Sequence, residues 1–265
     1  MSNVFIPQRG TTMFSLSKLT QIRLNCGPER TQDYHALQEE LNNQGQWYEN
    51  FYFENGASTP GRSPSPKKLL ALGLPNNLSN VQILDVGAYE GYYSIHCEQR
   101  GAEVIANDFF IWNLKDDNSR SNFELIKKVT GSKIKTLESP IAQLPIKKSD
   151  ITLFLGVLYH VEDQIETLRM IRDTAKSLVI LETLVDALDQ PGPNLRYYPG
   201  NSLNGDITNQ FGPNLEALQA MISQSGYRSW ELKSMWEFNT IQGLNQGNSL
   251  DSPLRSGRVV YWLYP

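Results

Sequence analysis

The sequence is poor in the residues that build disulfide frameworks and metal centres. Its 265 residues include only two cysteines and three histidines. The cysteines, Cys26 and Cys97, are too few for a disulfide framework, and the histidines are too few for a typical metal cluster. We therefore expect a protein without a metal centre, in a reducing compartment such as the cytoplasm.

Long hydrophobic runs and an excess of positive charge are missing too. No apolar run approaches the length that crosses a membrane, and residues 1–16 lack the apolar core of a signal peptide. The formal net charge of −4 argues against a protein held on nucleic acid by its overall field. With 40% hydrophobic and 20% charged residues, the composition is typical of a soluble globular protein. The sequence predicts no membrane partner and leaves the oligomeric state unknown.

The stretch Val81–Ser94 carries the clearest pattern in the chain. A β-branched, apolar run leads through two glycines into a helical pattern, which is typical of nucleotide-binding sites. The spacing is Asp85-x-Gly87-x-x-x-Gly91, and the bulky Tyr-Glu pair at 89–90 excludes the pyrophosphate of a dinucleotide. An acidic strand end instead favours a cationic or hydroxyl-bearing ligand, such as the amino-acid end of S-adenosylmethionine.

From residue 81 onward, strand and helix patterns alternate, which predicts an α/β fold with a mostly parallel sheet. Strands are expected near 81–86, 103–107, 132–136, 150–155, 177–183, 227–236 and 257–264. Helices are expected near 29–43, 66–72, 92–100, 116–129, 163–175 and 213–225, with Ser65 as the N-cap of the second. Residues 186–212 are rich in Pro, Gly and Asn and predict a lid or insertion; residues 242–249 predict a loop between the last two strands.

The N-terminal segment 1–62 differs from the rest. Residues 1–28 show no strong periodicity, and five aromatic residues fall within 47–53, beginning with Trp47 and Tyr48. These aromatic residues either cover a binding site as a lid or pack the N-terminal helix against the main body. We therefore predict an N-terminal extension and aromatic lid segment over 1–62, and a main domain over 63–265.

Two loops after strands are candidates for binding the nucleoside part of a ligand. Asp108 ends the second strand, where an acidic residue accepts hydrogen bonds from ribose hydroxyls; the alternative is a helix cap or turn residue. After the third strand, Ser139 and Ile141 lie where an adenine would sit, with Ile141 packing on the ring and a polar group reading its amine.

The exit of the fourth strand is the candidate reaction site. Leu155 and Gly156 end the strand, and glycine there permits close approach of a ligand. Tyr159 and His160 follow, where a transferred group and its acceptor would meet. His160 is either a general base near neutral pH or a structural residue that caps a turn.

These motifs resemble those of class I S-adenosylmethionine-dependent methyltransferases. Within that superfamily, the chain resembles the bacterial tRNA wobble-uridine carboxymethyltransferase family and its small-molecule relatives, over roughly residues 46–230. The segments that carry the similarity are Leu84–Gly87 with Gly91 and Tyr92, Gly156–His160, Leu181–Val185 and Arg196-Tyr197, with weaker support from Trp47, Thr59–Gly61 and Phe211–Asn214.

The resemblance implies a Rossmann-like, seven-stranded sheet whose last strand is antiparallel. It also implies that the cofactor lies across the carboxyl ends of the strands. The residues that it places around the methionine end are Asp85, Gly87, Gly91, Leu155 and Gly156. Asp108 would hold the ribose, and Tyr197 matches a tyrosine that helps to hold the carboxylate in carboxymethyl-transferring members.

One departure favours ordinary S-adenosylmethionine over the carboxylated cofactor. The carboxymethyltransferases carry a lysine-containing Trp-Arg-Lys-Gly-Pro-Phe stretch where this chain has 47–52, and Glu49 would repel a carboxylate. Arg255 and Arg258 could still bind one.

We therefore predict a cytoplasmic methyltransferase that modifies an oxygen or nitrogen of a small molecule. Trp47, Tyr48, Tyr197 and Tyr198 are the candidate substrate-binding residues, although each tyrosine equally fits simple packing. One alternative is a tRNA-modifying enzyme that acts at a wobble uridine. Against it, this chain lacks the basic N-terminal region that is expected of a tRNA-binding protein. Another is a cofactor-binding module without catalysis.

Overall fold

The computed structural model describes residues 22–27, 33–146, 149–238 and 255–265. The chain forms two compact units, residues 1–140 and 141–265, which are taken here one at a time. The seven strands of the main sheet divide between them, three in the first unit and four in the second. Within the described ranges, no helix is long and apolar enough to cross a bilayer.

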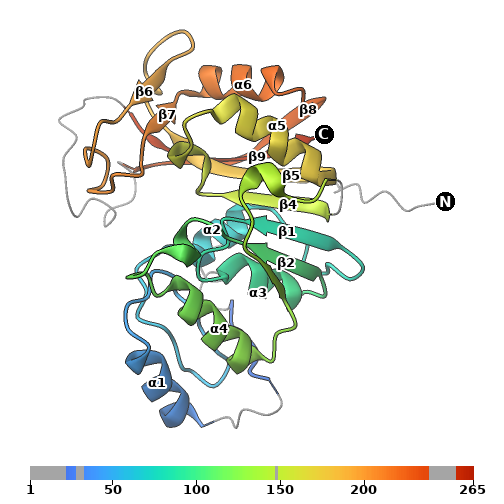
Figure 1. Ribbon diagram of the computed structural model, residues 1–265, viewed down its shortest axis with the longest axis vertical. Helices are drawn as coiled ribbons and strands as arrows, with labels where there is room; N and C mark the ends of the chain where they lie inside the picture. The colour runs from blue at the N-terminus through green and yellow to red at the C-terminus, as the bar shows by residue number, and fades with distance from the viewer. Residues whose placement is uncertain (1–21, 28–32, 147–148, 239–254) are drawn as a thin grey trace. The chain divides into compact units, whose positions relative to one another are not determined.

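The first unit contains a three-stranded parallel array in the order β3-β2-β1. Its strands are β1 (Gln82–Val86), β2 (Glu103–Asn107) and β3 (Lys135–Leu137). After β1 the chain enters α3 (Tyr92–Glu98), and α4 (Ser119–Thr130) connects β2 to β3 (Figure 1). Four of the five β1 side chains are buried, which explains why its sequence is a nearly continuous apolar run.

The residues before β1 pack on this unit through α1 (Tyr34–Asn43), α2 (Ser65–Ala71) and the aromatic segment 47–53. Asp33 caps α1 by accepting hydrogen bonds from the N–H groups of His35 and Ala36. Phe51 and Phe53 are completely buried, and Phe53 forms a β-bridge with Leu24. The aromatic segment is therefore mostly a packing element of the first unit.

The second unit contains four strands in the order β4-β5-β9-β8. β4 (Ser149–Leu155) and β5 (Ala175–Val185) are parallel, whereas β9 (Gly257–Tyr264) runs antiparallel to both β5 and β8 (Ser229–Glu237). The helices α5 (Gln164–Thr174) and α6 (Leu215–Gln224) lie together along these strands (Figure 1). The expected antiparallel last strand is thus confirmed.

Residues 186–212, expected as a lid or insertion, contain β6 (Leu195–Tyr197) and lead into β7 (Phe211–Pro213). Both strands are three residues long, too short to show a period in the sequence. Leu184, Tyr198 and Leu203 form a buried cluster, against which Tyr159 and Phe238 pack. This segment, called the lid segment or lid below, therefore has an apolar attachment to the end of β5, and its action as a lid stays a prediction.

Most predicted elements match the structure, with corrections at their ends. The third strand was expected over 132–136 but occupies 135–137, and β5 is longer than the predicted 177–183. Ser65 is the first residue of α2, and Pro64 is its N-cap. The helix expected over 29–43 begins at residue 34, and the predicted loop at 242–249 and much of 1–28 lie outside the described residues.

Candidate active site

In the first unit, the turn after β1 is organised by a buried carboxylate. Asp85 is 1% exposed, and its Oδ2 accepts a 2.7 Å hydrogen bond from Ser94 Oγ in α3. Burial raises the pKa of Asp85 to about 6, although the Ser94 bond opposes this. The carboxylate therefore ties the end of β1 to the first turn of α3.

The two glycines of this turn both have positive φ angles, 78° at Gly87 and 77° at Gly91. At Gly91 a Cβ would lie 2.2 Å from the Phe123 ring, which is completely buried and stacks on Trp112. Gly91 is therefore required by protein packing as well as by its left-handed backbone. The sequence reasoning attributed its role to ligand approach alone.

Asp108 follows β2 and faces the same turn. Its Oδ2 accepts a 3.2 Å bond from the Tyr89 N–H, and its Oδ1 accepts a 3.1 Å bond from the Ile111 N–H. Burial raises the pKa of this carboxyl, which is 6% exposed. Asp108 thus holds the backbone of the turn that leads into the following 3₁₀ helix, whose N-cap is Phe110; this agrees with the turn residue of the alternative interpretation. Each carboxylate oxygen has two acceptor positions, so this bonding leaves capacity for a ribose hydroxyl.

The loop after β3 is attached to the end of β2. Asn107 Nδ2 donates to the carbonyl oxygens of Leu137 and Ser139, at 2.9 and 3.0 Å. Ser139 is half-buried in the first unit, and Ile141, also half-buried, begins a 3₁₀ helix in the second. Their predicted contact with an adenine stays a prediction.

Sequence reasoning missed the role of Glu90, which anchors the aromatic segment to the motif turn. Its carboxylate is 2% exposed and accepts hydrogen bonds from the N–H groups of Tyr48 (3.0 Å) and Glu49 (2.7 Å). Asn122 Nδ2 donates to the same carboxylate at 2.8 Å. The sequence signals this role only by an acidic residue inside a glycine turn. That signal does not indicate that the carboxylate binds the backbone of Tyr48, 42 residues away.

The aromatic segment divides into buried and accessible side chains. Trp47 is 7% exposed and donates from Nε1 to the Leu41 carbonyl oxygen, so the structure places it in the core of the first unit. Tyr48 is half-buried and packs edge-on against Tyr89 of the motif turn. Of the two predicted substrate-binding residues here, Tyr48 is therefore the more accessible.

Two exposed aromatic residues after Asp108 were not singled out from the sequence. Phe109 is 47% exposed and Phe110 is 57% exposed, directly beyond the carboxyl end of β2. Exposed aromatic faces at such a position suit the planar ring of a bound base. The Asp-Phe-Phe run after a buried strand was the available signal.

In the second unit, β4 ends at Leu155, and Gly156 has a φ of 73°. The N–H of Gly156 donates to the Glu182 carbonyl oxygen at 2.9 Å. The Glu182 carboxylate forms a two-bond ion pair with Arg258 of β9, and the Arg258 guanidinium lies 5.0 Å from the centre of the Tyr159 ring. Tyr159 is thereby held beside the end of β4.

His160 lies next to Tyr159, with 4.2 Å between their ring centres. Its Nδ1 lies 3.0 Å from the carbonyl oxygen and 2.9 Å from Oγ1 of Thr208 in the lid. Burial lowers the pKa of His160, as does Arg258, whereas Thr208 and Asp206 raise it. The net lowering of the pKa favours the neutral form of this half-buried imidazole at pH 7.

The remaining candidate tyrosines differ in exposure. Tyr197 is 61% exposed and packs on Phe211 across β6 and β7. Tyr198 is 2% exposed, and its hydroxyl donates to Asp186, which also pairs with Arg196 at 3.0 Å. Tyr198 therefore bonds the first residue after β5, and Tyr197 is the accessible member of the pair.

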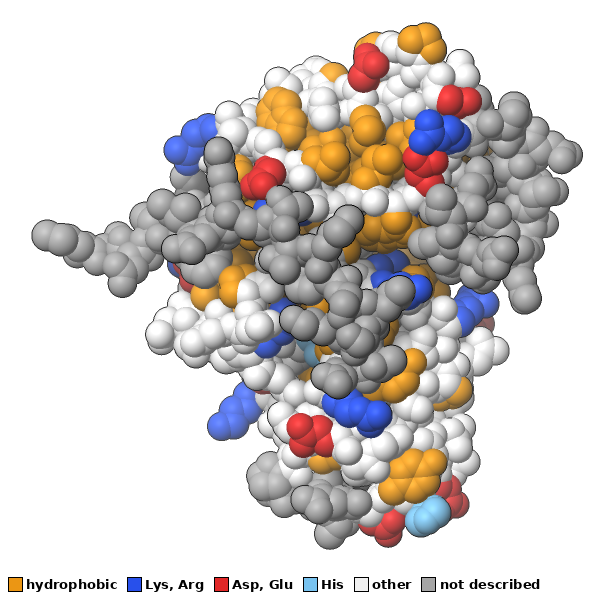
Figure 2. Space-filling model, turned by 180° about the vertical axis from the view of Figure 1, so that it is seen from behind, with side chains coloured by type: hydrophobic (Ala, Val, Ile, Leu, Met, Phe, Trp, Pro, Cys, Tyr) orange, Lys and Arg blue, Asp and Glu red, His pale blue; other side chains and the backbone are white. Residues whose placement is uncertain are grey.

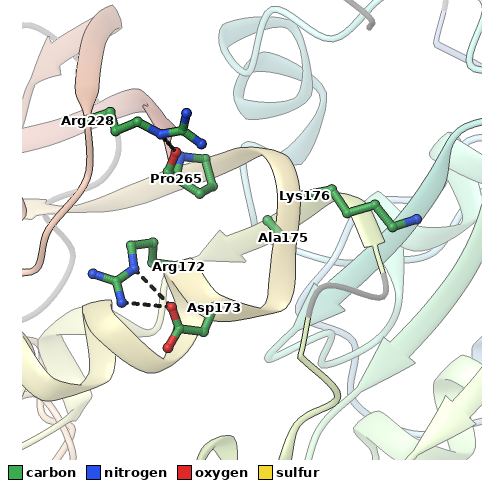
Figure 3. Close-up of a pocket in the computed structure, with 6 residues that line it drawn as sticks. All are labelled: Arg172, Asp173, Ala175, Lys176, Arg228 and Pro265. Carbon is green, nitrogen blue, oxygen red and sulfur yellow. Dashed lines mark hydrogen bonds and ion pairs between the residues drawn. The ribbon is translucent and has the colours of Figure 1, made fainter. Parts of the chain in front are cut away.

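A separate pocket at the start of β5 does not offer a site. Its lining includes Arg172, Lys176 and Arg228, but Arg172 bonds Asp173 and Arg228 donates to the carbonyl oxygen of Pro265 (Figure 3). Lys176 pairs with Asp150 at 3.3 Å. The pocket lies at the amino end of β5, whereas ligands of α/β sheets bind at the carboxyl ends of the strands. Among the described residues, no cluster of His, Cys, Asp and Glu side chains could hold a metal ion.

The chain matches the family model of the methyltransferase domain over residues 56–232, more than half of its length. The chain therefore belongs to this methyltransferase family. Its similarity to the tRNA wobble-uridine carboxymethyltransferases is not part of that match. A comparison with curated proteins found no match.

Solved structures share the fold at low sequence identity. The N-terminal domain of EvdMO1 with S-adenosylhomocysteine bound has a TM-score of 0.60 at 15% identity, covering 88% of this chain and 98% of that one. The same domain in the presence of S-adenosylhomocysteine and D-fucose gives 0.59 at 16% identity, with 88% and 97% covered. CrArsM, an arsenic(III) methyltransferase from Chlamydomonas reinhardtii, gives 0.52 at 14% identity, with 72% and 66% covered. The predicted Rossmann-like methyltransferase fold is thus confirmed.

Proposed function

We propose that the protein is an S-adenosylmethionine-dependent methyltransferase that transfers a methyl group to an oxygen or nitrogen of a small molecule. The observation that carries this proposal is the charge of the motif turn. Asp85 ends the strand that leads into the turn, and Asp108 accepts a hydrogen bond from the Tyr89 N–H within it; burial, and to a lesser degree the charge of Asp108, raises the pKa of Asp85. The turn 85–91 contains no lysine or arginine, so it suits a cationic, hydroxyl-bearing ligand and disfavours a phosphate.

Each part of the cofactor has candidate partners in the chain. Asp108 accepts from the ribose hydroxyls, Gly87 and Gly91 shape the turn around the methionine end, and Asp85 supports that turn from beneath. Ser139 and Ile141 are the proposed adenine contacts, to which the exposure of Phe109 and Phe110 adds two more candidates. In the second unit, Leu155 and Gly156 are the proposed contacts for the amine and sulfonium.

The acceptor side rests on four side chains. His160 is the proposed base and Tyr159 the residue beside it; Tyr48 and Tyr197 are half-buried or exposed and are the proposed substrate walls. Trp47 and Tyr198, expected in the same role, are 7% and 2% exposed, which leaves little of either side chain for a substrate.

Methyl transfer requires mainly that the protein align the acceptor with the methyl group. Bound S-adenosylmethionine supplies a methyl group that its sulfonium already activates. The chain's residues hold the acceptor in line, and His160 takes up the proton that the acceptor loses.

The pairing of two arginines supports the ordinary cofactor over the carboxylated one. Arg258 forms an ion pair with Glu182, and Arg255 forms one with Glu237. Both arginines that could bind the carboxylate of the cofactor are therefore already paired with a carboxylate of the protein. The Glu49 carboxylate, expected to repel such a cofactor, is 6% exposed and accepts from Ser65 Oγ. The Glu49 carboxylate is therefore held inside the first unit, and the paired arginines alone favour the ordinary cofactor.

The formal net charge of −4 gives the tRNA alternative little support. Figure 2 shows both Lys or Arg and Asp or Glu side chains on the face that it draws. A tRNA-binding protein needs a continuous basic path for phosphates, and its binding would fall steeply with salt.

A cytoplasmic location and a domain boundary at residues 62/63 stay predictions.

Methyl-labelled S-adenosylmethionine and a small-molecule extract of the source cells test the proposal. We expect wild-type protein to give a product heavier by one labelled methyl group, and His160→Gln to give far less. S-Adenosylhomocysteine binding should be equal in both proteins. Binding without any labelled product would support the non-catalytic module, and absence of binding would overturn the whole proposal.

A further inference from the structure

The contacts of His160 determine which of its ring nitrogens carries the hydrogen. Thr208 N–H and Oγ1 both donate to Asp206 Oδ1, at 2.8 and 2.6 Å. An ionised carboxylate only accepts hydrogen bonds, so the single hydroxyl hydrogen of Thr208 points to Asp206. The Thr208 carbonyl oxygen has no hydrogen to give. Both atoms that face Nδ1 are therefore acceptors, and Nδ1 must be the donor.

A neutral imidazole with its hydrogen on Nδ1 has its lone pair on Nε2. Among the described residues, the side-chain hydrogen bonds of His160 all fall on Nδ1, which leaves Nε2 available as a base. The lid is also bound to this turn through the backbone, because Gln210 N–H donates to the Tyr159 carbonyl oxygen at 2.9 Å. Residues 186–212 thus hold the ring through Thr208 and are bonded to the turn itself.

We infer that Thr208 and Asp206 are positioning residues that hold His160 as the Nδ1–H tautomer, and that the acceptor group is a hydroxyl. This inference rests on the proposed methyltransferase function. A hydroxyl gains most from a base during transfer, whereas an amine can release its proton to water. In the step, the acceptor oxygen bonds the methyl carbon, the carbon–sulfur bond breaks with its electrons going to sulfur, and the hydroxyl proton passes to Nε2.

Two opposite charges act on the imidazolium that results. Asp206 of the lid stabilises it through Thr208, and Arg258 of β9, already paired with Glu182 of β5, disfavours it. Removal of the Asp206 charge should therefore lower the pKa of His160 further and weaken it as a base.

Nitrogen-detected histidine NMR tests the tautomer without any acceptor. The chain has only three histidines, and His160→Gln assigns the signal of the third. We expect wild-type His160 to be neutral at pH 7 with its hydrogen on Nδ1. Asp206→Ala frees the Thr208 hydroxyl, so the Nε2–H form should gain population. A wild-type ring that is Nε2–H at pH 7, or an unchanged tautomer in Asp206→Ala, overturns the positioning role.

Kinetics on the acceptor found by methyl labelling give a second readout. Thr208→Val should lower kcat by roughly tenfold to a hundredfold with little change in KM, and Thr208→Ser should restore most of it. The product should carry its methyl group on oxygen. A methyl group on nitrogen, or equal kcat in Thr208→Val, overturns the inference. If wild-type protein does not bind S-adenosylhomocysteine, the proposed function fails rather than this inference.

Discussion

The two turns that follow β1 and β4 use polar side chains in opposite ways. In the turn after β1, the carboxylates of Asp85 and Glu90 are almost completely buried and bonded to the protein itself. In the turn after β4, the side-chain bonds that His160 makes to other described residues all fall on one ring nitrogen, and the ring is half-buried. The first turn is built for shape and the second keeps a reactive atom available.

This difference has a physical basis. A buried carboxylate costs folding energy unless hydrogen bonds satisfy it, so such a group is useful for holding backbone in place. A general base must exchange a proton with its substrate, so one of its atoms has to remain unpaired. We therefore expect substitutions in the first turn to affect stability most, and those in the second to affect catalysis.

Gly91→Ala should have the largest effect on stability. Its Cβ would add a clash with the buried Phe123 ring to the cost of a positive φ, a loss of about 3 kcal/mol in the free energy of unfolding. Gly192→Ala is a matched control, because Gly192 has the same φ of 77° and no atom within 4 Å of the added Cβ. Urea unfolding should give that control a loss of about 1 kcal/mol. Equal losses would show that packing at Gly91 contributes nothing.

Glu90→Gln should lower the free energy of unfolding by about 2 kcal/mol. The NH₂ group of the new amide is a donor, and it would face the N–H groups that donate to the carboxylate in the wild-type protein. Glu103→Gln, on the exposed face of β2, should change the unfolding free energy by less than about 0.5 kcal/mol. Hydrogen exchange of the Tyr48 and Glu49 amides should accelerate only in the first variant. Unchanged protection of those amides would contradict the anchoring role of Glu90.

A second histidine, His96 in α3, sharpens the comparison with His160. It is 4% exposed, and burial lowers its pKa from 6.5 to about 3. The folded state therefore binds fewer protons than the unfolded state, and stability is lost as the pH falls below about 6.5. Wild type should lose about 2 kcal/mol more than His96→Phe between pH 7 and pH 5. Parallel pH curves for the two proteins would show that His96 has an ordinary pKa.

The sequence predicted the parts that depend on local patterns. The apolar run before Gly87 and the strand at 257–264 both have the expected positions. Contacts between distant residues were not predictable, because no local period marks them. The bond from Tyr48 to Glu90 spans 42 residues, and the bond from His160 to Thr208 spans 48.

The roles of single side chains were the least predictable. Trp47 and Tyr198 have the residue types of a binding wall, yet the structure buries both. Aromatic residues favour cores and binding sites for the same reason, their large apolar area, so composition alone does not separate the two. Asp108 illustrates the same ambiguity, because a cap and a ribose contact both require a carboxylate at a strand end.

The central claim is that the turn after β1, with Asp108, binds S-adenosylmethionine. Calorimetric titration with S-adenosylhomocysteine, on wild-type and Asp108→Ala proteins of verified folding, tests it most directly. The account predicts one site per chain in wild type and at least tenfold weaker binding in the variant, about 1.4 kcal/mol. Equal affinity in the two folded proteins would contradict the ribose assignment, and absence of binding in wild type would contradict the claim itself.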